Sequence, residues 1–408
     1  MTDSPSTARI LFLTHNYPRH REDFAGRFVA RLAELVVARG HQVMVVAPHA
    51  AGCAMEEEDH GVLVRRFRYA SDADEVIAYR GEMGKIQLAG PLGMAAYWRF
   101  VRSFTQAAQR AIADSQPTAM HAHWWVPGGW VASRVKSSVP LVVTMHGTDL
   151  RMIERKAWIR PLAANVFDRA RTITVVSQSL ADGVATLMPR ARQKLRVTPM
   201  PANDTAFQPA TEPSSANSTP VILCVTRFTA QKRNDVLLRA IGQLAQDPMD
   251  LRVRLVGEGP LEDEVRSLAR ERGIAQMIEF VPPMAQDALA DEYRRADLVV
   301  LPAVDEGFGM VLIEAQMCGT AVLGARSGGI IDIIDHERTG LLFEPDDVNA
   351  LTEGLKRLVR DPDLRQRVAK AGRESAERRF SSRAIVDRFL GWYGAADDRT
   401  TRKGQDTP

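Results

Sequence analysis

Two glutamates, Glu306 and Glu314, lie eight residues apart in a stretch that also contains Gly307 and Gly309. A helix that begins near Gly309 exposes free backbone N–H groups at its start, and the glycines let a ligand approach the backbone closely. Eight residues are about two helical turns, so both carboxylates can face one ligand. We expect a site for an anion or for sugar hydroxyls here. The alternative is that Glu306 only complements the helix dipole and Glu314 is an exposed helix residue.

Two cations form a second candidate site. Arg227 and Lys232 follow a strand predicted over 221–226 and precede a predicted helix. A planar guanidinium and a compact ammonium at the carboxyl edge of a parallel sheet can converge on a diphosphate. Cations in loops are usually just solvated, so it is the position at the strand end, rather than the charge, that favours a phosphate site.

The elements that must position these residues alternate between strand and helix in both halves of the chain. In the first half we predict strands over 9–14, 42–47, 119–122, 141–144 and 172–176, with a helix over 26–38. In the second half we predict strands over 221–226, 251–256, 278–281, 298–301 and 321–323, with helices over 235–246, 261–272, 287–294 and 310–317. This order predicts an α/β fold of two doubly wound, Rossmann-like domains that face each other across a cleft.

Composition sets the expected domain boundaries. We predict an N-terminal domain over 1–200, a Pro- and Ser-rich linker over 201–219 and a second domain over 220–381. A helix over 382–395 is expected to pack back towards the N-terminal domain, and the polar residues 396–408 are expected to be a disordered tail.

The overall composition excludes several classes of protein. The 408 residues are 45% hydrophobic and 25% charged, and no apolar run approaches the ~20 residues of a membrane-spanning helix. The start of the chain shows no secretory signal, and Cys53, Cys224 and Cys318 lack disulfide or metal spacing, so we expect a cytoplasmic protein. Residues 1–205 carry a net charge of +8 and residues 206–408 a net charge of −5, which suggests two sites of different chemistry.

Two common phosphate-binding signatures are missing. Neither opening strand is followed by Gly-x-Gly-x-x-Gly, and the chain has no Walker A sequence. Hydride transfer with a nicotinamide or flavin, and phosphoryl transfer by a P-loop, are therefore disfavoured. We expect no cofactor and no bound metal.

The motifs together resemble glycosyltransferase family four, the retaining sugar-nucleotide enzymes of the GT-B fold. The resemblance covers about residues 9–395 and rests on the Arg227 and Lys232 pair, the two glutamates around Gly-Phe-Gly, and Gly328-Gly. It implies an N-terminal acceptor domain and a C-terminal donor domain. It also implies that Arg227 and Lys232 bind the donor diphosphate, Glu314 the ribose hydroxyls and Glu306 the transferred sugar. Backbone amides would contact sugar and phosphate at Gly307, Phe308, Gly309 and Met310.

The same resemblance gives roles to residues of the first half. The loop 144–149 resembles the family's histidine loop, so His146 is implied at the reacting sugar, and Gly26 matches a glycine loop near the phosphates. His121 and His123 alternate on a strand end and share one face; with Asp149 they are candidate acceptor contacts. A metal site could be drawn from the same residues, but a metal-independent family explains them without an ion.

These residues predict a retaining hexosyltransferase that uses a nucleotide-diphosphate sugar and a hydroxyl of a glycan, a lipid-linked or a small-molecule acceptor. The alternatives are a sugar-nucleotide epimerase or phosphorylase on the same fold, and a non-catalytic sugar-nucleotide-binding protein. Basic residues at 65–69 and an amphipathic stretch over 97–113 suggest peripheral contact with an anionic membrane, at the inner face of the cytoplasmic membrane; a solvated strand end and a packed helix explain them equally. No nucleic-acid motif accompanies the basic charge.

Overall fold

Short runs of Val, Ile and Leu form the strands of two separate sheets. The computed structural model describes residues 7–20, 23, 25–79, 90–210, 219–247 and 250–395. The central strands, such as β5 (Ala119–His123) and β12 (Leu298–Leu301), are buried at every residue. Strands of this kind are covered by helices on both faces, which is the typical setting of a parallel sheet. None of the helices in the described part of the chain has the length and apolar character needed to cross a bilayer.

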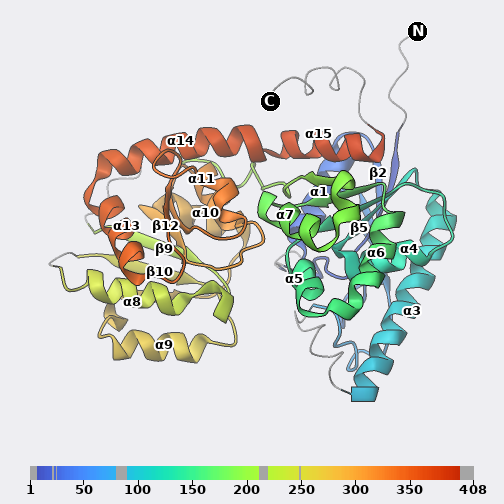
Figure 1. Ribbon diagram of the computed structural model, residues 1–408, viewed down its shortest axis with the longest axis horizontal. Coiled ribbons are helices and arrows are strands. Elements are labelled where there is room, and N and C mark those ends of the chain that lie inside the picture. The colour runs from blue at the N-terminus through green and yellow to red at the C-terminus, as the bar shows by residue number, and fades with distance from the viewer. Residues whose placement is uncertain are drawn as a thin grey trace, which may run out of the picture. The chain divides into compact units, whose positions relative to one another are not determined.

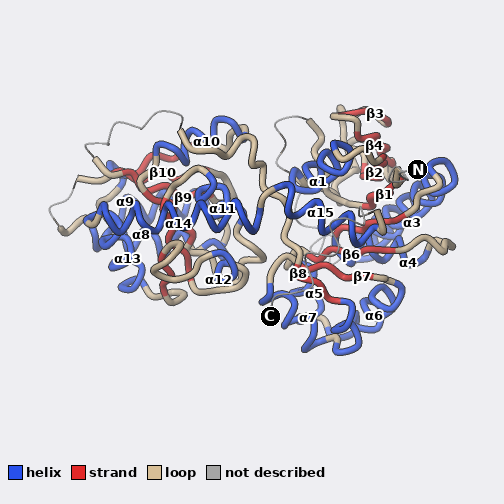
Figure 2. Tube along the Cα trace, turned by 90° about the horizontal axis from the view of Figure 1, so that it is seen from above, coloured by secondary structure: helices blue, strands red, loops and turns tan. Residues whose placement is uncertain are grey.

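The first compact unit comprises residues 1–176, 180–201 and 383–408. Its sheet has the strand order β3-β4-β2-β1-β5-β6-β7-β8, which can be followed in Figure 2, and only the β3–β4 pair is antiparallel. Its other strands are β1 (Arg9–Leu13), β2 (Gln42–Pro48), β3 (Glu56–Asp59), β4 (Val62–Phe67), β6 (Leu141–Met145), β7 (Thr172–Val175) and β8 (Leu195–Val197). The helices are α1 (Arg27–Ala38), α3 (Gly90–Ser115), α4 (Trp130–Arg134), α5 (Thr148–Arg155), α6 (Arg160–Arg169), α7 (Gln178–Leu187) and α15 (Ser382–Tyr393).

The second unit comprises residues 177–179 and 202–382 and holds a parallel sheet of order β11-β10-β9-β12-β13-β14. In Figure 1, α8 and α9 lie on one side of its strands, and α10 and α11 on the other. The strands besides β12 are β9 (Val221–Val225), β10 (Arg252–Val256), β11 (Ile278–Val281), β13 (Ala321–Ala325) and β14 (Leu341–Phe343). The helices are α8 (Asn234–Leu244), α9 (Glu262–Glu271), α10 (Gln286–Arg295), α11 (Met310–Met317), α12 (Ile330–Ile333), α13 (Val348–Arg360) and α14 (Pro362–Phe380).

Each sheet contains one point where the strand order reverses. In the first unit it lies between β1 and β5, and in the second between β9 and β12. In doubly wound sheets, ligands bind beyond the carboxyl ends of the strands at such a point. The candidate residues follow these strands: His123 ends β5, Arg227 comes two residues after β9, and Glu306 comes five residues after β12.

The predicted two-domain α/β architecture is confirmed, and all ten predicted strands are present. Sequence analysis missed β3, β4, β8 and β14 because these strands, at or next to the sheet edges, are short or rich in charge. In β4 the charge is neutralised: Arg65 pairs with Glu56 and Asp114, and the buried Arg66 pairs with Glu57. The predicted tail 396–408 and the linker residues 211–218 lie outside the described residues.

Candidate active site

The loop after β12 is shaped by contacts with a pair of glycines further along the chain. A Cβ atom added at Gly328 would lie 2.2 Å from the Glu306 carbonyl oxygen, and one at Gly329 would lie 2.5 Å from the Gly307 oxygen. The backbone N–H of Gly329 donates to the Glu306 carbonyl at 2.8 Å. Only glycine leaves room for this close approach, and Gly328 also has a φ of +54°. Gly328 and Gly329 therefore fix the backbone that carries Glu306.

Glu306 pairs directly with Lys232. The Lys232 Nζ lies 2.5 Å from the Glu306 Oε2, although the residues are 74 positions apart. Two further bonds join the loops: Val304 N–H donates to the Gln231 carbonyl, and Gln231 Nε2 donates to the Asp305 carbonyl. The two side chains are 23% and 15% exposed, so the pair is partly open to a ligand. An ammonium has three N–H donors, and two remain after this contact.

Arg227 lies in the same loop as Lys232, between β9 and α8, and the turn after β10 holds this part of the loop. The Phe228 N–H donates to the Glu258 carbonyl, and a Cβ atom at Gly257 would lie 1.9 Å from the Thr226 oxygen. The Arg227 side chain is exposed and has no ion-pair partner among the described residues. The loop therefore presents a free guanidinium at the same sheet edge, five residues before Lys232.

The residues between the two glutamates offer their backbone rather than their side chains. Gly309 has a φ of +98° and caps α11, whose first turn holds no acidic residue. The amides of the first turn, including Met310, have no partner within the helix and suit an anion. The Phe308 ring is only 6% exposed and packs edge-on against Phe380 with ring centroids 5.6 Å apart. Phe308 therefore anchors the loop.

Glu314 lies further along the same helix. Its side chain is nearly buried, and its Oε2 accepts a hydrogen bond of 2.9 Å from the Tyr293 hydroxyl on α10. Burial raises the pKa of Glu314 to about 7, and the Tyr293 hydrogen bond lowers it in part. The described residues supply no partner for the other oxygen. Sequence analysis missed Tyr293, because nothing in its local pattern links it to a residue 21 positions away.

In the first unit the histidine loop is built around the buried carboxylate of Asp149. The Asp149 carboxylate is 2% exposed and accepts four backbone N–H bonds, from Trp125, His146, Gly147 and Leu150. Burial raises its pKa to about 6. Because these bonds occupy the carboxylate, Asp149 holds the histidine loop in place, which differs from the expected acceptor contact.

The three histidines of this region have different environments. His121 is fully buried; its Nδ1 lies 2.7 Å from the Tyr393 hydroxyl and its Nε2 2.6 Å from the Thr144 hydroxyl. It is therefore closed to an acceptor, unlike the expectation. His123 is also fully buried, and its Nδ1 lies 3.3 Å from the His146 Nε2. His146 is partly exposed, and burial lowers its pKa to about 3, so it is neutral at physiological pH.

In the glycine loop of the first unit, both the backbone conformation and the close packing require a glycine at the position of Gly26. Its φ is +71°, and a Cβ atom would lie 2.1 Å from the Asn16 carbonyl oxygen. Gly26 caps α1, whose first turn has no acidic residue. The loop thus brings the first amides of α1 close to the end of β1, at the reversal point of the first sheet.

The comparisons with known proteins agree with this geometry. A family model described as Glycosyltransferase Family 4 matches residues 25–206, and one described as Glycosyl transferases group 1 matches residues 210–375. A D-inositol 3-phosphate glycosyltransferase of Saccharomonospora viridis is 31% identical, with 84% of this chain and 87% of that protein covered. The chain belongs to glycosyltransferase family 4. It is a sugar-nucleotide glycosyltransferase, as the sequence predicted.

Several solved structures share the fold of this chain. Sucrose-phosphate synthase from Thermosynechococcus elongatus has a TM-score of 0.78 at 23% identity, over 95% of this chain and 98% of that one. Anabaena HepE in complex with UDP-glucose has a TM-score of 0.72 at 18% identity, over 95% and 100%. The predicted GT-B fold is confirmed.

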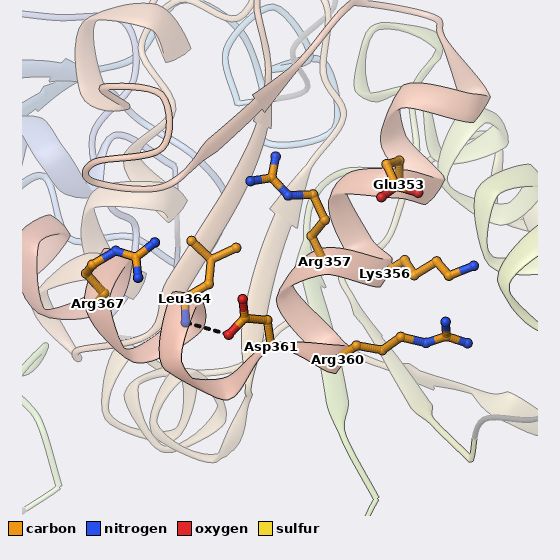
Figure 3. A pocket seen from close by; sticks show the side chains of 7 residues that line it. All are labelled: Glu353, Lys356, Arg357, Arg360, Asp361, Leu364 and Arg367. Atoms are coloured by element: carbon orange, nitrogen blue, oxygen red, sulfur yellow. Dashed lines mark hydrogen bonds between the residues drawn. The ribbon is translucent and has the colours of Figure 1, made fainter.

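A separate hollow of about 340 Å³ lies at the junction of α13 and α14 (Figure 3). It contains none of the candidate residues. Three of its four cations are paired: Lys356 and Arg360 contact Asp247, and Arg357 contacts Glu337. Asp361 accepts the N–H of Leu364 and caps α14, as the dashed line in Figure 3 shows. These pairings explain the cluster as part of the surface of this unit.

Proposed function

We propose that this family 4 enzyme transfers a hexosyl unit from a nucleoside diphosphate sugar to the hydroxyl of a glycan, lipid-linked or small-molecule acceptor, with retention of the anomeric configuration. The observation that carries the proposal is the Lys232–Glu306 contact of 2.5 Å, in which Lys232 comes from the loop that also holds Arg227. A cation for the diphosphate and a carboxylate for the adjoining sugar must be neighbours, because the two parts of the donor are joined by one bond.

The proposed chemistry needs no nucleophilic carboxylate. The bond from the sugar C1 to the phosphate oxygen breaks, the bond from C1 to the acceptor oxygen forms on the same face, and the acceptor proton passes to the leaving phosphate. Arg227, Lys232 and the first amides of α11 stabilise the charge that develops on the phosphate. Glu306 holds the sugar through its hydroxyls, and Glu314 accepts hydrogen bonds from the ribose through its unpartnered oxygen.

The comparisons suggest which substrates to test first. Among the structural neighbours, HepE is solved with UDP-glucose, and starch synthase IV of Arabidopsis thaliana with ADP and acarbose. The curated relatives are named as D-inositol 3-phosphate glycosyltransferases. We therefore propose a UDP- or ADP-linked hexose as donor and a polyhydroxylated acceptor. His146 and Gly26 of the first unit are proposed to act on the same donor, at its sugar and its phosphates.

The decisive experiment removes both diphosphate cations. In the Arg227→Ala/Lys232→Ala variant we expect transfer to fall by about 10²–10³-fold, the loss seen when one well-placed donor is removed from an anion site. The matched control is Arg252→Ala/Lys370→Ala, because both residues are exposed, and Arg252 begins β10 at the opposite end of the sheet. Full transfer by the first variant would refute the diphosphate role.

Two reactions without the acceptor separate the alternatives. An epimerase converts the sugar nucleotide alone, and a phosphorylase consumes or forms a sugar phosphate when inorganic phosphate is present. We expect neither reaction, and we expect product only after an acceptor is added. Proton NMR of that product should show the anomeric configuration of the donor; an inverted product would contradict retention.

We also propose peripheral contact with an anionic membrane through the start of α3. Leu92, Met94 and Trp98 are 85%, 43% and 53% exposed, and Arg99 and Arg102 are exposed beside them. An exposed apolar face with basic residues beside it favours an anionic bilayer surface. The basic run at 65–69 is not part of this surface, because its arginines are paired with acidic residues.

Liposome flotation at low salt tests the membrane contact. We expect the protein to float with vesicles that contain anionic lipid, and the Leu92→Ser/Trp98→Ser variant to remain in the dense fraction. Trp158→Ser is the control, because this tryptophan is 78% exposed outside α3. Equal flotation of all three proteins, or none at all, would eliminate the proposed surface.

A further inference from the structure

The contact of His123 with His146 constrains where the imidazole protons lie. His123 ends β5 opposite Thr144 of β6, and its ring is fully buried. Its Nδ1 lies 3.3 Å from the His146 Nε2, whereas its Nε2 is buried and has no partner among the described residues. A neutral imidazole carries one N–H donor and one acceptor nitrogen, and the hydrogen bond made by one nitrogen decides the state of the other.

Two proton arrangements can satisfy the contact. In the first, the His123 Nδ1–H donates to the His146 Nε2, and the buried His123 Nε2 is a bare lone pair. In the second, the His146 Nε2–H donates to the His123 Nδ1, and the buried His123 Nε2 must then carry a proton with no acceptor. An orphaned buried N–H group is rarer and costlier than an under-used acceptor. The first arrangement is therefore favoured.

Among the described residues, no other side chain hydrogen-bonds to the His123 or His146 ring, although His15 is near enough to lower the pKa of both. The His123 ring lies against Phe12 and His121, with centroids 5.2 and 4.0 Å away. His121 has both of its nitrogens bonded, to Tyr393 and Thr144. The His146 ring packs against Trp124 at 4.4 Å and Phe28 at 4.9 Å. Trp124 has a φ of +62°, a strained conformation that places a bulky ring against His146 and limits its movement.

We infer that His123 is a positioning residue that holds His146 in the Nδ1–H tautomer, so that His146 presents a hydrogen-bond donor to the substrate rather than a base. The inference deepens the proposed function and rests on it for the identity of the substrate. An Nδ1–H group donates to a sugar hydroxyl or phosphate oxygen, and it cannot accept the proton of the attacking hydroxyl. This agrees with a reaction in which the leaving phosphate takes that proton.

The direct test is the tautomer of His146 in the full-length protein without substrate. Long-range ¹H–¹⁵N spectra of protein labelled on histidine distinguish a protonated from an unprotonated ring nitrogen, and His146→Gln assigns the signals. We expect a protonated Nδ1 and an unprotonated Nε2 for His146 at neutral pH. The opposite pattern overturns the inference whatever the enzyme's activity proves to be.

Variants of His123 connect the tautomer to turnover. His123→Asn keeps an N–H group at the position of Nδ1, whereas His123→Phe keeps a ring without it. We expect kcat to fall about tenfold in the Phe variant, which corresponds to the free energy of one hydrogen bond, and the donor KM to change little. In the Asn variant we expect kcat to recover. His121→Phe is the control for a disturbed core: it should lower the melting temperature but leave the His146 signals unchanged.

The outcomes separate this inference from the proposed function. If no donor and acceptor support transfer but the spectra show the Nδ1–H form, the proposed function fails and the positioning role of His123 stands. If transfer occurs and His123→Phe retains both its rate and the His146 tautomer, the positioning role fails and the proposed function stands.

Discussion

The two units present opposite kinds of chemistry at the reversal points of their sheets. In the second unit the candidate groups are charged and partly exposed, and Lys232 is compensated by Glu306. In the first unit they are neutral and largely buried, with His146 at a pKa of about 3 and packed among aromatic rings. A diphosphate has to be met by charge, whereas neutral donors suffice to orient a sugar hydroxyl. The difference supports the proposal that one unit provides electrostatic stabilisation and the other provides orientation.

The largest effect that can break this comparison is expected at Glu306. Glu306→Ala removes the sugar contact and the partner of Lys232, so we expect kcat to fall by about 10²–10³-fold with a smaller change in donor affinity. Steady-state kinetics measures both. Glu258→Ala is the control, because Glu258 is an exposed acid in the neighbouring strand-end loop. A variant with unchanged kcat would remove Glu306 from the proposed site.

The next largest effect on the rate is expected in the two loops where a glycine allows close backbone packing. In Gly328→Ala the new Cβ would lie 2.2 Å from the Glu306 oxygen, and in Gly26→Ala 2.1 Å from the Asn16 oxygen, so both loops must shift. A misplacement of about 1 Å costs about 10²-fold in rate. Gly319→Ala and Gly52→Ala are matched controls with positive φ but no atom within 4 Å. Equal activity of all four variants would show that neither loop needs its close approach.

A smaller effect is expected for nucleotide binding at Glu314. Glu314→Ala should weaken the donor dissociation constant by about 10–100-fold, which corresponds to about 1.5–3 kcal/mol for hydrogen bonds to a charged group. Isothermal titration with a UDP- or ADP-hexose measures this change. A loss of kcat at unchanged affinity would instead place Glu314 at the reacting sugar.

The smallest effect is a pH dependence of donor affinity that originates at Glu314 of the second unit. Because burial raises the pKa of Glu314 to about 7, its carboxylate forms as pH rises through that value. Donor affinity should therefore increase about tenfold from pH 6 to pH 8 and then level off. Tyr293→Phe removes a hydrogen bond that favours the carboxylate, so the midpoint should move upward. His146 should add no step between pH 5 and 8; a step that vanishes in His146→Gln would contradict its neutral state.

Much of the molecule follows from local sequence. The alternation of apolar runs with amphipathic segments predicts the strands and helices of both units, because burial on both faces of a parallel strand demands an unbroken apolar run. The sequence around Glu306, Gly309 and Glu314 likewise predicts a strand end, a loop and a helix start. Glycine marks the loop because it adopts a positive φ, as Gly309 does, without steric cost. The type of ligand could therefore be inferred without coordinates.

Only the tertiary structure decided which of these groups meet. Lys232 contacts Glu306 across 74 residues, and Tyr393 closes off His121 across 272 residues. Such contacts depend on the order of strands in each sheet and on the packing of α15, which local periodicity does not encode. The pKa of Glu314 and the orphaned nitrogen of His123 have the same origin, because both result from burial by residues distant in the chain. Residue types and spacing thus determined the chemistry that was available, and the fold decided which side chains are free to perform it.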